Sequence, residues 1–224
     1  MHGRKYRNAA ATCGVVFVNS EFTGRDVAET LGVPAERIHV ARPAPKHVYR
    51  ADGPAADLGK PYVLTVATLE PRKNLQVLVD AHRLLGDDLV LAVVGAEGWG
   101  VQPALDAPGI ARLGFVSDEE LARLYRGAAV VAYPSRFEGF GIPVIEAMAC
   151  GVPVVVSAHG SLDEASGQAA LRADPEDPAA FASAIEHAVA ERDRLAALGI
   201  EHVKAFSWRS TGEVFLRGYE EARS

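Results

Sequence analysis

The chain has 224 residues, of which 49% are hydrophobic and 23% charged, so it holds enough apolar material for the core of one large domain. Its net charge of −6 argues against nucleic acid as a partner, because a phosphate backbone is bound by a basic face. The sequence has no apolar run near the ~18 residues of a membrane-spanning helix and no secretory signal at its start, so we expect a cytoplasmic protein, either free or peripheral at the inner membrane face.

The first fifty residues predict a single strand–helix–strand unit. A strand over Gly14–Ser20 runs into a helix that ends at Gly32, and a second short strand leads into a proline-rich loop. One such unit cannot bury both of its faces, so we interpret residues 1–50 as the remnant of a second domain. Residues 51–60 have no period and many turn formers, which is typical of a linker.

Strands and helices alternate more completely from residue 61 onward. We expect strands at the segments YVLTVAT, LVLAVVG, IARLGFV, AVVAYPS and GVPVVVS. We expect helices over Asn74–Leu85, after a capping box of Ser117 and Glu120, from Pro143, over Pro178–Ala197 and over Ser207–Ala222. This alternation predicts an α/β fold, with a Rossmann-like doubly wound parallel sheet over residues 61–205. Residues 206–224 are expected to form a helix that packs back towards the N-terminal part.

In open parallel sheets, ligands bind at the carboxyl ends of the strands, and the segment TLEPRKN follows one such end. Arg72 and Lys73 lie at the start of a helix, where free backbone N–H groups add to their charge. The segment therefore suits a phosphate or diphosphate. A solvated surface pair is the alternative interpretation of these two cations.

A second strand end carries two carboxylates. Gly139 and Gly141 allow a ligand to approach the backbone before a helix begins. Glu138 and Glu146, eight positions apart, can accept hydrogen bonds from vicinal hydroxyls, which are abundant in sugars. The alternative is that Glu146 only complements the helix dipole while Glu138 is solvated.

The remaining motifs indicate structure rather than chemistry. Gly95–Gly100 matches neither the P-loop nor the dinucleotide fingerprint, so a structural turn is favoured. The histidines, among them His159 in a loop, show no metal-ligand spacing. Cys13 and Cys150 lie far apart beside small apolar residues, and we expect both to be buried free thiols.

Taken together, these segments resemble family 4 glycosyltransferases, retaining enzymes with two facing Rossmann-like domains, the GT-B fold. The resemblance runs from about Val15 to the end of the chain. Its most specific part is EGFGIPVIE, which matches the family's Glu-x7-Glu pattern, and it extends over TLEPRKN, LARLYRGAAVVAYPS, EAMACGVPVVVS and SLDEASGQAALRADPED.

The resemblance implies roles for individual residues. Glu138, Lys73 and Arg72 would be the catalytic group, with Glu138 on the donor hexose and the two cations on the diphosphate, without a metal ion or other cofactor. Glu146 would bind the ribose, and the turn Gly114–Val116 would lie against the base. The donor-binding residues would be Glu146, Gly139, Phe140, Gly141, Ile142, Thr68, Gly114 and Val116. Thr68 stands where many members carry an arginine, and Glu164 matches a recurrent acidic position without an assigned role.

The implied activity is transfer of a hexose, mannose or glucose, from a nucleotide-diphosphate sugar such as GDP-mannose to a glycan or lipid-linked acceptor, with retention. Family members carry a further N-terminal portion that binds the acceptor, of which residues 1–50 resemble only the tail. A partner chain could therefore supply that half. The alternative is a non-catalytic nucleotide-sugar-binding module; an epimerase or phosphorylase fits the Glu-x7-Glu segment less well.

Overall fold

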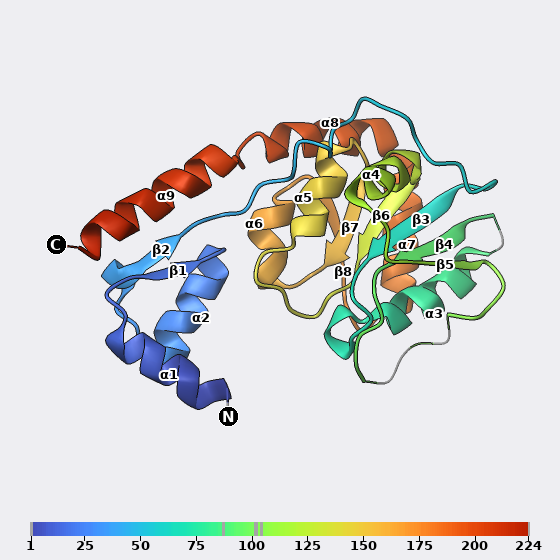
Figure 1. Ribbon diagram of the computed structural model, residues 1–224. Coiled ribbons are helices and arrows are strands. Elements are labelled where there is room, and N and C mark those ends of the chain that lie inside the picture. Colours follow the sequence, from blue (N-terminus) through green and yellow to red (C-terminus); the bar gives the residue numbers. More distant parts are fainter. Residues whose placement is uncertain (1, 87, 101–102, 104, 224) are drawn as a thin grey trace. The chain divides into compact units, whose positions relative to one another are not determined.

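The computed structural model describes residues 2–86, 88–100, 103 and 105–223, and it divides the chain into two compact units (Figure 1). The first unit comprises residues 1–44 and 206–224, and the second comprises residues 45–205. The boundary at residue 44 lies upstream of the segment 51–60, which belongs to the second unit. There the side chain of Arg126 donates hydrogen bonds to the carbonyl oxygens of Pro54 (2.8 Å) and Arg50 (3.2 Å). None of the helices in the described ranges is both long and apolar enough to cross a membrane.

The second unit is built on a parallel sheet. Within the described residues it has six strands in the order β5-β4-β3-β6-β7-β8. The strands are β3 (Tyr62–Val66), β4 (Val90–Val94), β5 (Ile110–Gly114), β6 (Val130–Tyr133), β7 (Val154–Ser157) and β8 (Ala170–Ala173). This order confirms the predicted doubly wound Rossmann-like sheet, and its switch point lies between β3 and β6, which pair directly.

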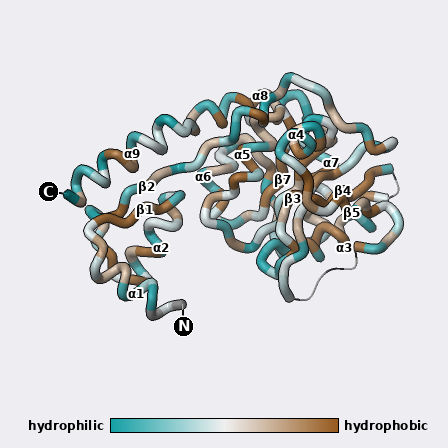
Figure 2. Tube along the Cα trace, in the orientation of Figure 1, coloured by the Kyte–Doolittle hydropathy of each residue, from teal (hydrophilic) through white to brown (hydrophobic). Residues whose placement is uncertain are grey.

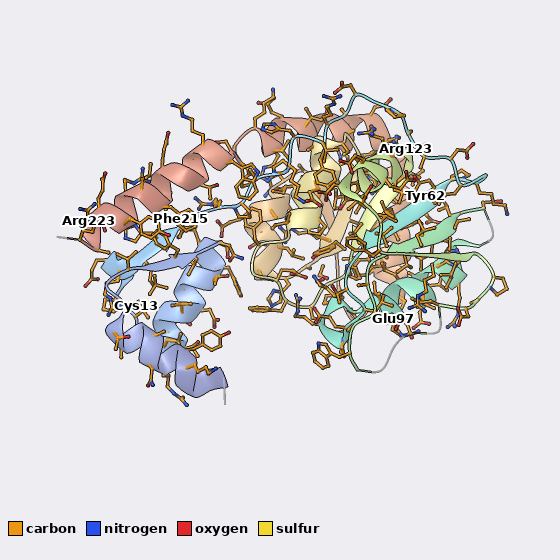
Figure 3. All side chains as sticks on the ribbon, viewed as in Figure 1. Cys13, Tyr62, Glu97, Arg123, Phe215 and Arg223 are labelled. Carbon is orange, nitrogen blue, oxygen red and sulfur yellow. The ribbon has the colours of Figure 1, made fainter. Side chains whose placement is uncertain are left out.

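Helices cover both faces of this sheet. They are α3 (Leu75–Leu85), α4 (Asp118–Gly127), α5 (Ile142–Ala149), α6 (Asp163–Ser166), α7 (Pro178–Ala190) and α8 (Arg192–Val203), with the short 3-10 turns η2 (Pro71–Lys73) and η3 (Gly160–Leu162). Helices α3 and α7 pack together on one face, whereas α4 and α5 contact β3, β6 and β7 on the other, and α8 packs on α5. The hydrophobic residues concentrate on the strands and on the helix faces turned towards them (Figure 2). Tyr62 at the start of β3 (Figure 3) is buried and donates to the carbonyl oxygen of Leu124 in α4 (2.7 Å).

The predicted helix over Pro178–Ala197 is wrong in one respect, because the structure has two helices there. Helix α7 begins at an Asp177 cap, whose carboxylate accepts from the backbone N–H groups of Ala179 and Ala180. It ends at Ala190, because the backbone of the following Glu191 (φ −103°, ψ 25°) leaves the helical region. The next residue, Arg192, donates to the carbonyl oxygens of Ala128 and Ala129 (2.7 Å each), which draws α8 to the opposite side of the sheet.

The turn Gly95–Gly100 packs on the segment that follows β3. A Cβ atom at Gly95 would lie 1.8 Å from the carbonyl oxygen of Ala67, and one at Gly98 would lie 2.2 Å from that of Leu69. The two loops are bridged at Leu69 and Glu97. These glycines therefore serve a close backbone contact, as the structural interpretation of the turn predicted.

The first unit contains α1 (His2–Thr12), β1 (Val16–Val18), α2 (Glu21–Leu31), η1 (Ala35–Arg37), β2 (Ile38–Val40) and α9 (Trp208–Glu221). Strands β1 and β2 pair in parallel, and α9 contacts β2. The rings of Phe17 and Phe215 lie 4.6 Å apart between centroids, and a Cβ atom at Gly218 would meet the Phe17 ring at 2.5 Å. The last helix thus packs closely on this small sheet.

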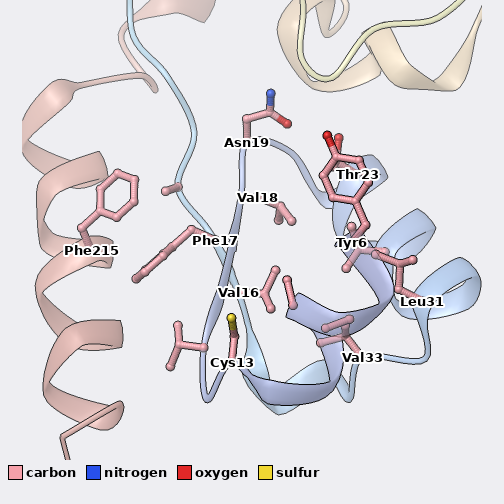
Figure 4. Close-up of a pocket in the computed structure, with 15 residues that line it drawn as sticks. Tyr6, Cys13, Val16, Phe17, Val18, Asn19, Thr23, Leu31, Val33 and Phe215 are labelled. Carbon is pink, nitrogen blue, oxygen red and sulfur yellow. The ribbon is translucent and has the colours of Figure 1, made fainter. Parts of the chain in front are cut away.

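An apolar pocket of about 550 Å³ lies within the first unit (Figure 4). Val16 and Val18 point into it from β1, and Cys13 is at its edge. Cys13 is exposed, so its predicted burial is wrong, whereas Cys150 is buried; both are free thiols. Cys13 comes one residue after α1, a helix that the sequence did not predict, where the chain turns at the surface.

Candidate functional site

The candidate site forms at the switch point of the sheet. Arg72 and Lys73 follow β3, and Glu138 follows the neighbouring β6. After β3 the chain continues to β4 on one side, and after β6 it continues to β7 on the other, so the two loops diverge and leave the carboxyl ends accessible. Lys73 and Glu138, which are 65 positions apart in the sequence, are thereby brought into contact.

Lys73 and Glu138 form a buried ion pair. The Lys73 ammonium lies 2.7 Å from Oε1 of Glu138, and their side chains are 11% and 9% exposed. The hydroxyl of Tyr133, the last residue of β6, accepts from Lys73 (2.9 Å) and donates to the same carboxylate oxygen (3.0 Å). Lys73 is held here because it ends η2, next to Asn74, whose left-handed backbone (φ 54°) starts α3. The Lys73 ammonium, the Tyr133 hydroxyl and Oε1 of Glu138 are thus each hydrogen-bonded to the other two.

Arg72 binds the other side of the same carboxylate. Its guanidinium lies 2.9 Å from Oε2 of Glu138 and donates to the carbonyl oxygen of Phe137 (2.7 Å). It also pairs with Glu70, which accepts from the indole of Trp99 (3.1 Å). The Arg72 side chain is 39% exposed, so solvent or a ligand can reach it while Lys73 stays buried.

Charge favours the ionised form of Glu138. Burial disfavours ionisation, but the adjacent Lys73 ammonium and Arg72 guanidinium outweigh it, and the pKa of the Glu138 carboxyl falls below its usual value. The same carboxylate helps to raise the pKa of Arg72 against the opposing effect of burial. A diphosphate that reached these cations would compete with Glu138 for them.

The loop that carries Glu138 is held by a buried serine. The backbone N–H of Glu138 donates to Oγ of Ser161 (3.0 Å), which also hydrogen-bonds Nδ1 of His159 (2.8 Å). The His159 ring packs edge-on against Phe137. His159, which on sequence alone looks like a surface histidine, is therefore a structural support of the loop.

The glycine turn after Glu138 leads directly into α5. Phe140 is buried in the core. Gly141 has φ 100°, and a Cβ atom there would lie 2.8 Å from Leu162. Gly139 is half-buried, and Ile142 is exposed at the first position of α5. The N-terminus of α5 follows this turn, and its helix dipole favours negative charge there.

Glu146 lies in a different environment, further along α5. It is buried, and the Tyr125 hydroxyl of α4 donates to its Oε2 (3.3 Å). Burial raises the pKa of the Glu146 carboxyl to about 7. The ring of Tyr125 meets that of Tyr49 edge-on, and the Tyr49 hydroxyl donates to Asp118 (2.9 Å). Lys46 pairs with the same Asp118 (2.6 Å).

The other predicted donor-binding residues lie at neighbouring strand ends. Thr68 is exposed after β3, beside the glycine turn that follows β4. Gly114 ends β5 with φ 67°, and Val116 is half-buried two residues later. The carbonyl oxygen of Glu164 faces the ring of His202 (3.2 Å). The structure thus joins Arg72, Lys73 and Glu138 directly. Thr68 shares the segment after β3 with the two cations, Gly139 to Gly141 share the loop of Glu138, Ile142 and Glu146 belong to α5, and Gly114 and Val116 lie at the end of β5.

Several polar residues of the site are absent from the sequence-based prediction. Tyr133 ends a strand and Tyr125 lies on a helix, so periodicity alone assigns both to the core. Ser161 lies in the segment after β7, the strand next to β6. Because parallel strands end at the same edge of a sheet, that segment could have been searched for further residues of the site. No group of three His, Cys, Asp or Glu side chains that could hold a metal occurs within the described ranges. Contacts between distant segments bring the missed residues to the site, and such contacts leave no signal in the local sequence. The missed residues are Tyr125, Tyr133, Ser161, Asp118, Tyr49 and Lys46.

Comparison with known proteins places this geometry in context. The family profile described as "Glycosyl transferases group 1" matches residues 60–191. The O-antigen chain mannosyltransferase B of Escherichia coli is 33% identical over 229 residues, covering 92% of this chain and 60% of that protein. The D-inositol 3-phosphate glycosyltransferase of Thermobifida fusca (strain YX) is 35% identical over 161 residues, 65% of this chain and 37% of its own length. The chain therefore spans 60% or less of these relatives.

Solved structures share the fold at lower identity. The glycosyltransferase from Rickettsia africae ESF-5 superposes with a TM-score of 0.82 at 17% identity, covering 98% of this chain and 67% of its own. Anabaena Alr3699/HepE in complex with UDP-glucose gives 0.76 at 20% identity, covering 95% and 64%. These neighbours are GT-B glycosyltransferases, and the Rossmann-like sheet matches theirs.

Proposed function

Because this chain belongs to the group 1 glycosyl transferases, we propose that it forms the donor-binding part of a retaining hexosyltransferase. The donor is a nucleoside diphosphate sugar carrying mannose or glucose, and the acceptor is a glycan or a lipid-linked sugar. The name of the E. coli relative, a mannosyltransferase, and the UDP-glucose bound in the Anabaena neighbour support these sugars.

The observation that carries the proposal is the cluster of Arg72, Lys73 and Glu138 at the switch point. Two cations and a carboxylate meet there beside a glycine turn and a helix start, on loops that diverge. Arg72 and Lys73 suit the diphosphate, and a carboxylate released from them suits the hydroxyls of a hexose. The N-terminus of α5, which begins at Ile142, adds a favourable helix dipole for the phosphate.

In the proposed reaction, the bond between the anomeric carbon and the β-phosphate oxygen breaks while the acceptor oxygen bonds to that carbon from the same face. The acceptor proton passes to the departing diphosphate. Lys73 and Arg72 stabilise the negative charge that develops on the leaving group, as preorganised cations do in other sites. Glu138 orients the hexose and stabilises its positive charge without forming a bond to it. No metal ion or other cofactor is needed for these steps.

Glu146 is proposed to accept hydrogen bonds from the ribose hydroxyls. Its burial and the nearby Tyr125 hydroxyl hold the carboxyl in one position. A ribose would replace the single long hydrogen bond with two shorter ones to an ionised carboxylate. Binding of the nucleotide would then favour proton release from Glu146 near neutral pH.

Calorimetry of the full chain with nucleoside diphosphates tests the proposal. Glu146→Ala should weaken binding of the free diphosphate, whereas Glu138→Gln, which frees both cations, should keep it and weaken only the nucleotide sugar. Glu186→Ala, an exposed glutamate of α7, is the matched control and should change neither. Absence of heat with every nucleoside diphosphate, or equal effects of the two variants on the free diphosphate, contradicts the proposal.

A second candidate is a nucleotide-sugar-binding module that acts only with a partner chain, because the cluster of Arg72, Lys73 and Glu138 would serve donor binding equally in either case. It predicts donor binding without transfer by the chain alone. An acceptor assay with a radiolabelled donor separates the two, because turnover by the chain alone is incompatible with a module that depends on a partner.

A further inference from the structure

The exposed aromatic side chains of the second unit gather at one edge of its sheet. Within the described ranges of that unit they are Trp99 (67% exposed), Phe115 (84%) and Phe137 (41%), which follow β4, β5 and β6. The other phenylalanine and tyrosine side chains described in this unit are buried. Exposed apolar groups that gather at the ligand-binding edge, rather than being scattered, indicate a ligand with an apolar face.

Trp99 is anchored although most of its ring is exposed. Its indole N–H donates to Oε2 of Glu70 (3.1 Å), and Oε1 of Glu70 pairs with the Arg72 guanidinium (2.5 Å). The turn that carries Trp99 packs on the segment after β3, because a Cβ atom at Gly100 would lie 2.6 Å from the Pro71 ring. An indole that is held by its one polar atom and is 67% exposed presents its carbon surface to solvent.

A hollow of about 240 Å³ adjoins the same carboxylate. Its lining includes the polar side chains of Glu70, Asn74, Gln76 and Arg136. The volume is below the roughly 300–1,000 Å³ of sites for drug-sized ligands, so it suits a single small ring. Each oxygen of Glu70 accepts one of the hydrogen bonds given above and retains acceptor capacity for another.

We propose that Trp99 and Glu70 form a subsite for a hexose of the acceptor glycan, an inference that rests on the proposed function. A pyranose ring has a face of C–H groups and a rim of hydroxyls. The indole covers the C–H face, which removes apolar surface from water. The Glu70 carboxylate accepts a hydrogen bond from a hydroxyl of the rim.

The position of this subsite relative to Arg72 favours the acceptor over the donor. In the proposed reaction the acceptor oxygen approaches the face from which the diphosphate leaves, so the acceptor lies beside the diphosphate. Arg72, which is proposed to hold that diphosphate, contacts Glu138 through one terminal nitrogen and Glu70 through the other. Glu138 is assigned to the donor hexose, so the side of Arg72 that carries Glu70 and Trp99 is left for the acceptor.

The fluorescence of Trp99 gives the first test. The chain has two tryptophans, and the other, Trp208, lies in α9 of the first unit, so Trp208→Phe leaves Trp99 as the single reporter. Titration with mannotriose or maltotriose should shift the Trp99 emission to shorter wavelength and reduce its quenching by acrylamide. Absence of both changes with both trisaccharides overturns the subsite and identifies Trp99 as an anchor of its turn.

Saccharide affinity gives the second test. In calorimetry, Trp99→Ala should weaken trisaccharide binding roughly tenfold or more, because the apolar contact with the indole is lost. Trp208→Ala is the matched control and should keep the wild-type affinity. Both variants should bind nucleoside diphosphates as the wild type does. Equal losses of diphosphate and trisaccharide in Trp99→Ala place the indole on the donor and overturn the inference. If Trp99→Ala fails to fold, the fluorescence titration of Trp208→Phe decides.

Ternary binding separates this inference from the proposed function. The chain saturated with GDP or UDP should bind the trisaccharide at least as tightly as the free chain does, because acceptor and diphosphate occupy different places. Competition between them assigns the subsite to the donor and overturns the inference. Diphosphate binding without binding of either trisaccharide overturns this inference alone, whereas failure of every nucleoside diphosphate to bind contradicts the proposed function itself.

Discussion

Glu138 and Glu146 lie eight residues apart, yet the fold gives their carboxylates opposite chemistry. Glu138 meets two cations and a phenol, and its pKa is lowered. Glu146 is buried to a similar extent but meets one phenol, and its pKa rises to about 7. Burial is common to both, so the difference comes from the residues that β3 and η2 bring to one carboxylate and α4 brings to the other. Identical side chains in one motif thus differ in their tendency to ionise, which is consistent with the different roles proposed for them.

The largest expected effect on stability comes from removing the Lys73 ammonium beside Glu138. Lys73→Met leaves the buried Glu138 carboxylate with Arg72 alone and should lower the free energy of unfolding by about 3 kcal/mol, because one charge of a buried pair loses its partner. Urea unfolding at pH 7.5 measures this. Lys60→Met, at an exposed lysine, is the control and should change stability little.

A double-variant cycle sharpens this test. Adding Glu138→Gln to Lys73→Met should restore part of the lost stability, because the unpaired charge is removed. If the two changes are additive, the ion pair is not the source of the effect and the contrast between the two glutamates is weaker than its geometry indicates.

The raised pKa of Glu146 should be visible in how the free energy of unfolding depends on pH. The folded chain holds its proton to about pH 7, whereas the ordinary carboxyl pKa is 4.5, so the free energy of unfolding falls as the pH rises between these values. Glu146→Gln removes this loss and, relative to wild type, should gain roughly 3 kcal/mol between pH 4 and pH 8. Urea titrations at both pH values measure the gain; parallel pH profiles of the two proteins would show that Glu146 does not titrate abnormally.

The pH dependence that Glu138 gives to the free energy of unfolding has the opposite sign. Its lowered pKa makes its contribution complete above the ordinary carboxyl pKa and lost as the pH falls through the lower folded-state value. The loss of unfolding free energy caused by Glu138→Gln should therefore become smaller in acid. The gain of unfolding free energy caused by Glu146→Gln should become smaller there too. Comparing the two variants in one buffer series tests whether both carboxylates differ as the structure indicates.

The two phenols offer a smaller, matched comparison. Tyr133→Phe removes a hydroxyl that joins two charged groups at 2.9 and 3.0 Å and should cost about 2 kcal/mol. Tyr125→Phe removes one hydrogen bond of 3.3 Å to a carboxyl that is partly protonated near neutral pH and should cost about 1 kcal/mol. Thermal or urea unfolding at pH 7.5 measures both, and the reverse order would contradict the assigned contacts.

The smallest effect on stability is expected at Arg72. Its side chain is 39% exposed, so Arg72→Ala should change the free energy of unfolding by less than about 1 kcal/mol. Binding of a nucleoside diphosphate should nevertheless weaken roughly tenfold, because a charge-assisted contact is lost. Calorimetry and urea unfolding of one preparation separate the two; a large stability loss with unchanged binding would make Arg72 structural.

Much of the second unit follows from local patterns. β-Branched runs mark β3, β4, β6 and β7, and Ser117 caps α4 by accepting from the N–H of Glu120 (3.2 Å), as its position predicts. The break at Glu191 and the strand β8 were missed, because both depend on contacts with the rest of the sheet, namely Arg192 with the end of α4 and β8 with β7. Periodicity reports which face of a segment is apolar and not where that segment packs.

The sequence by itself determined which residues carry charge at the strand ends: Arg72 and Lys73 after one strand, Glu138 and Glu146 around another. Hydrophobic periodicity and turn residues are local, so they also sufficed for the parallel α/β fold. Only the tertiary structure decided that Lys73 meets Glu138 across 65 residues, that Glu146 stays apart with Tyr125, and that Lys46 reaches Asp118. Those contacts depend on the order of strands in the sheet, and the electrostatics of each carboxylate depends on those contacts.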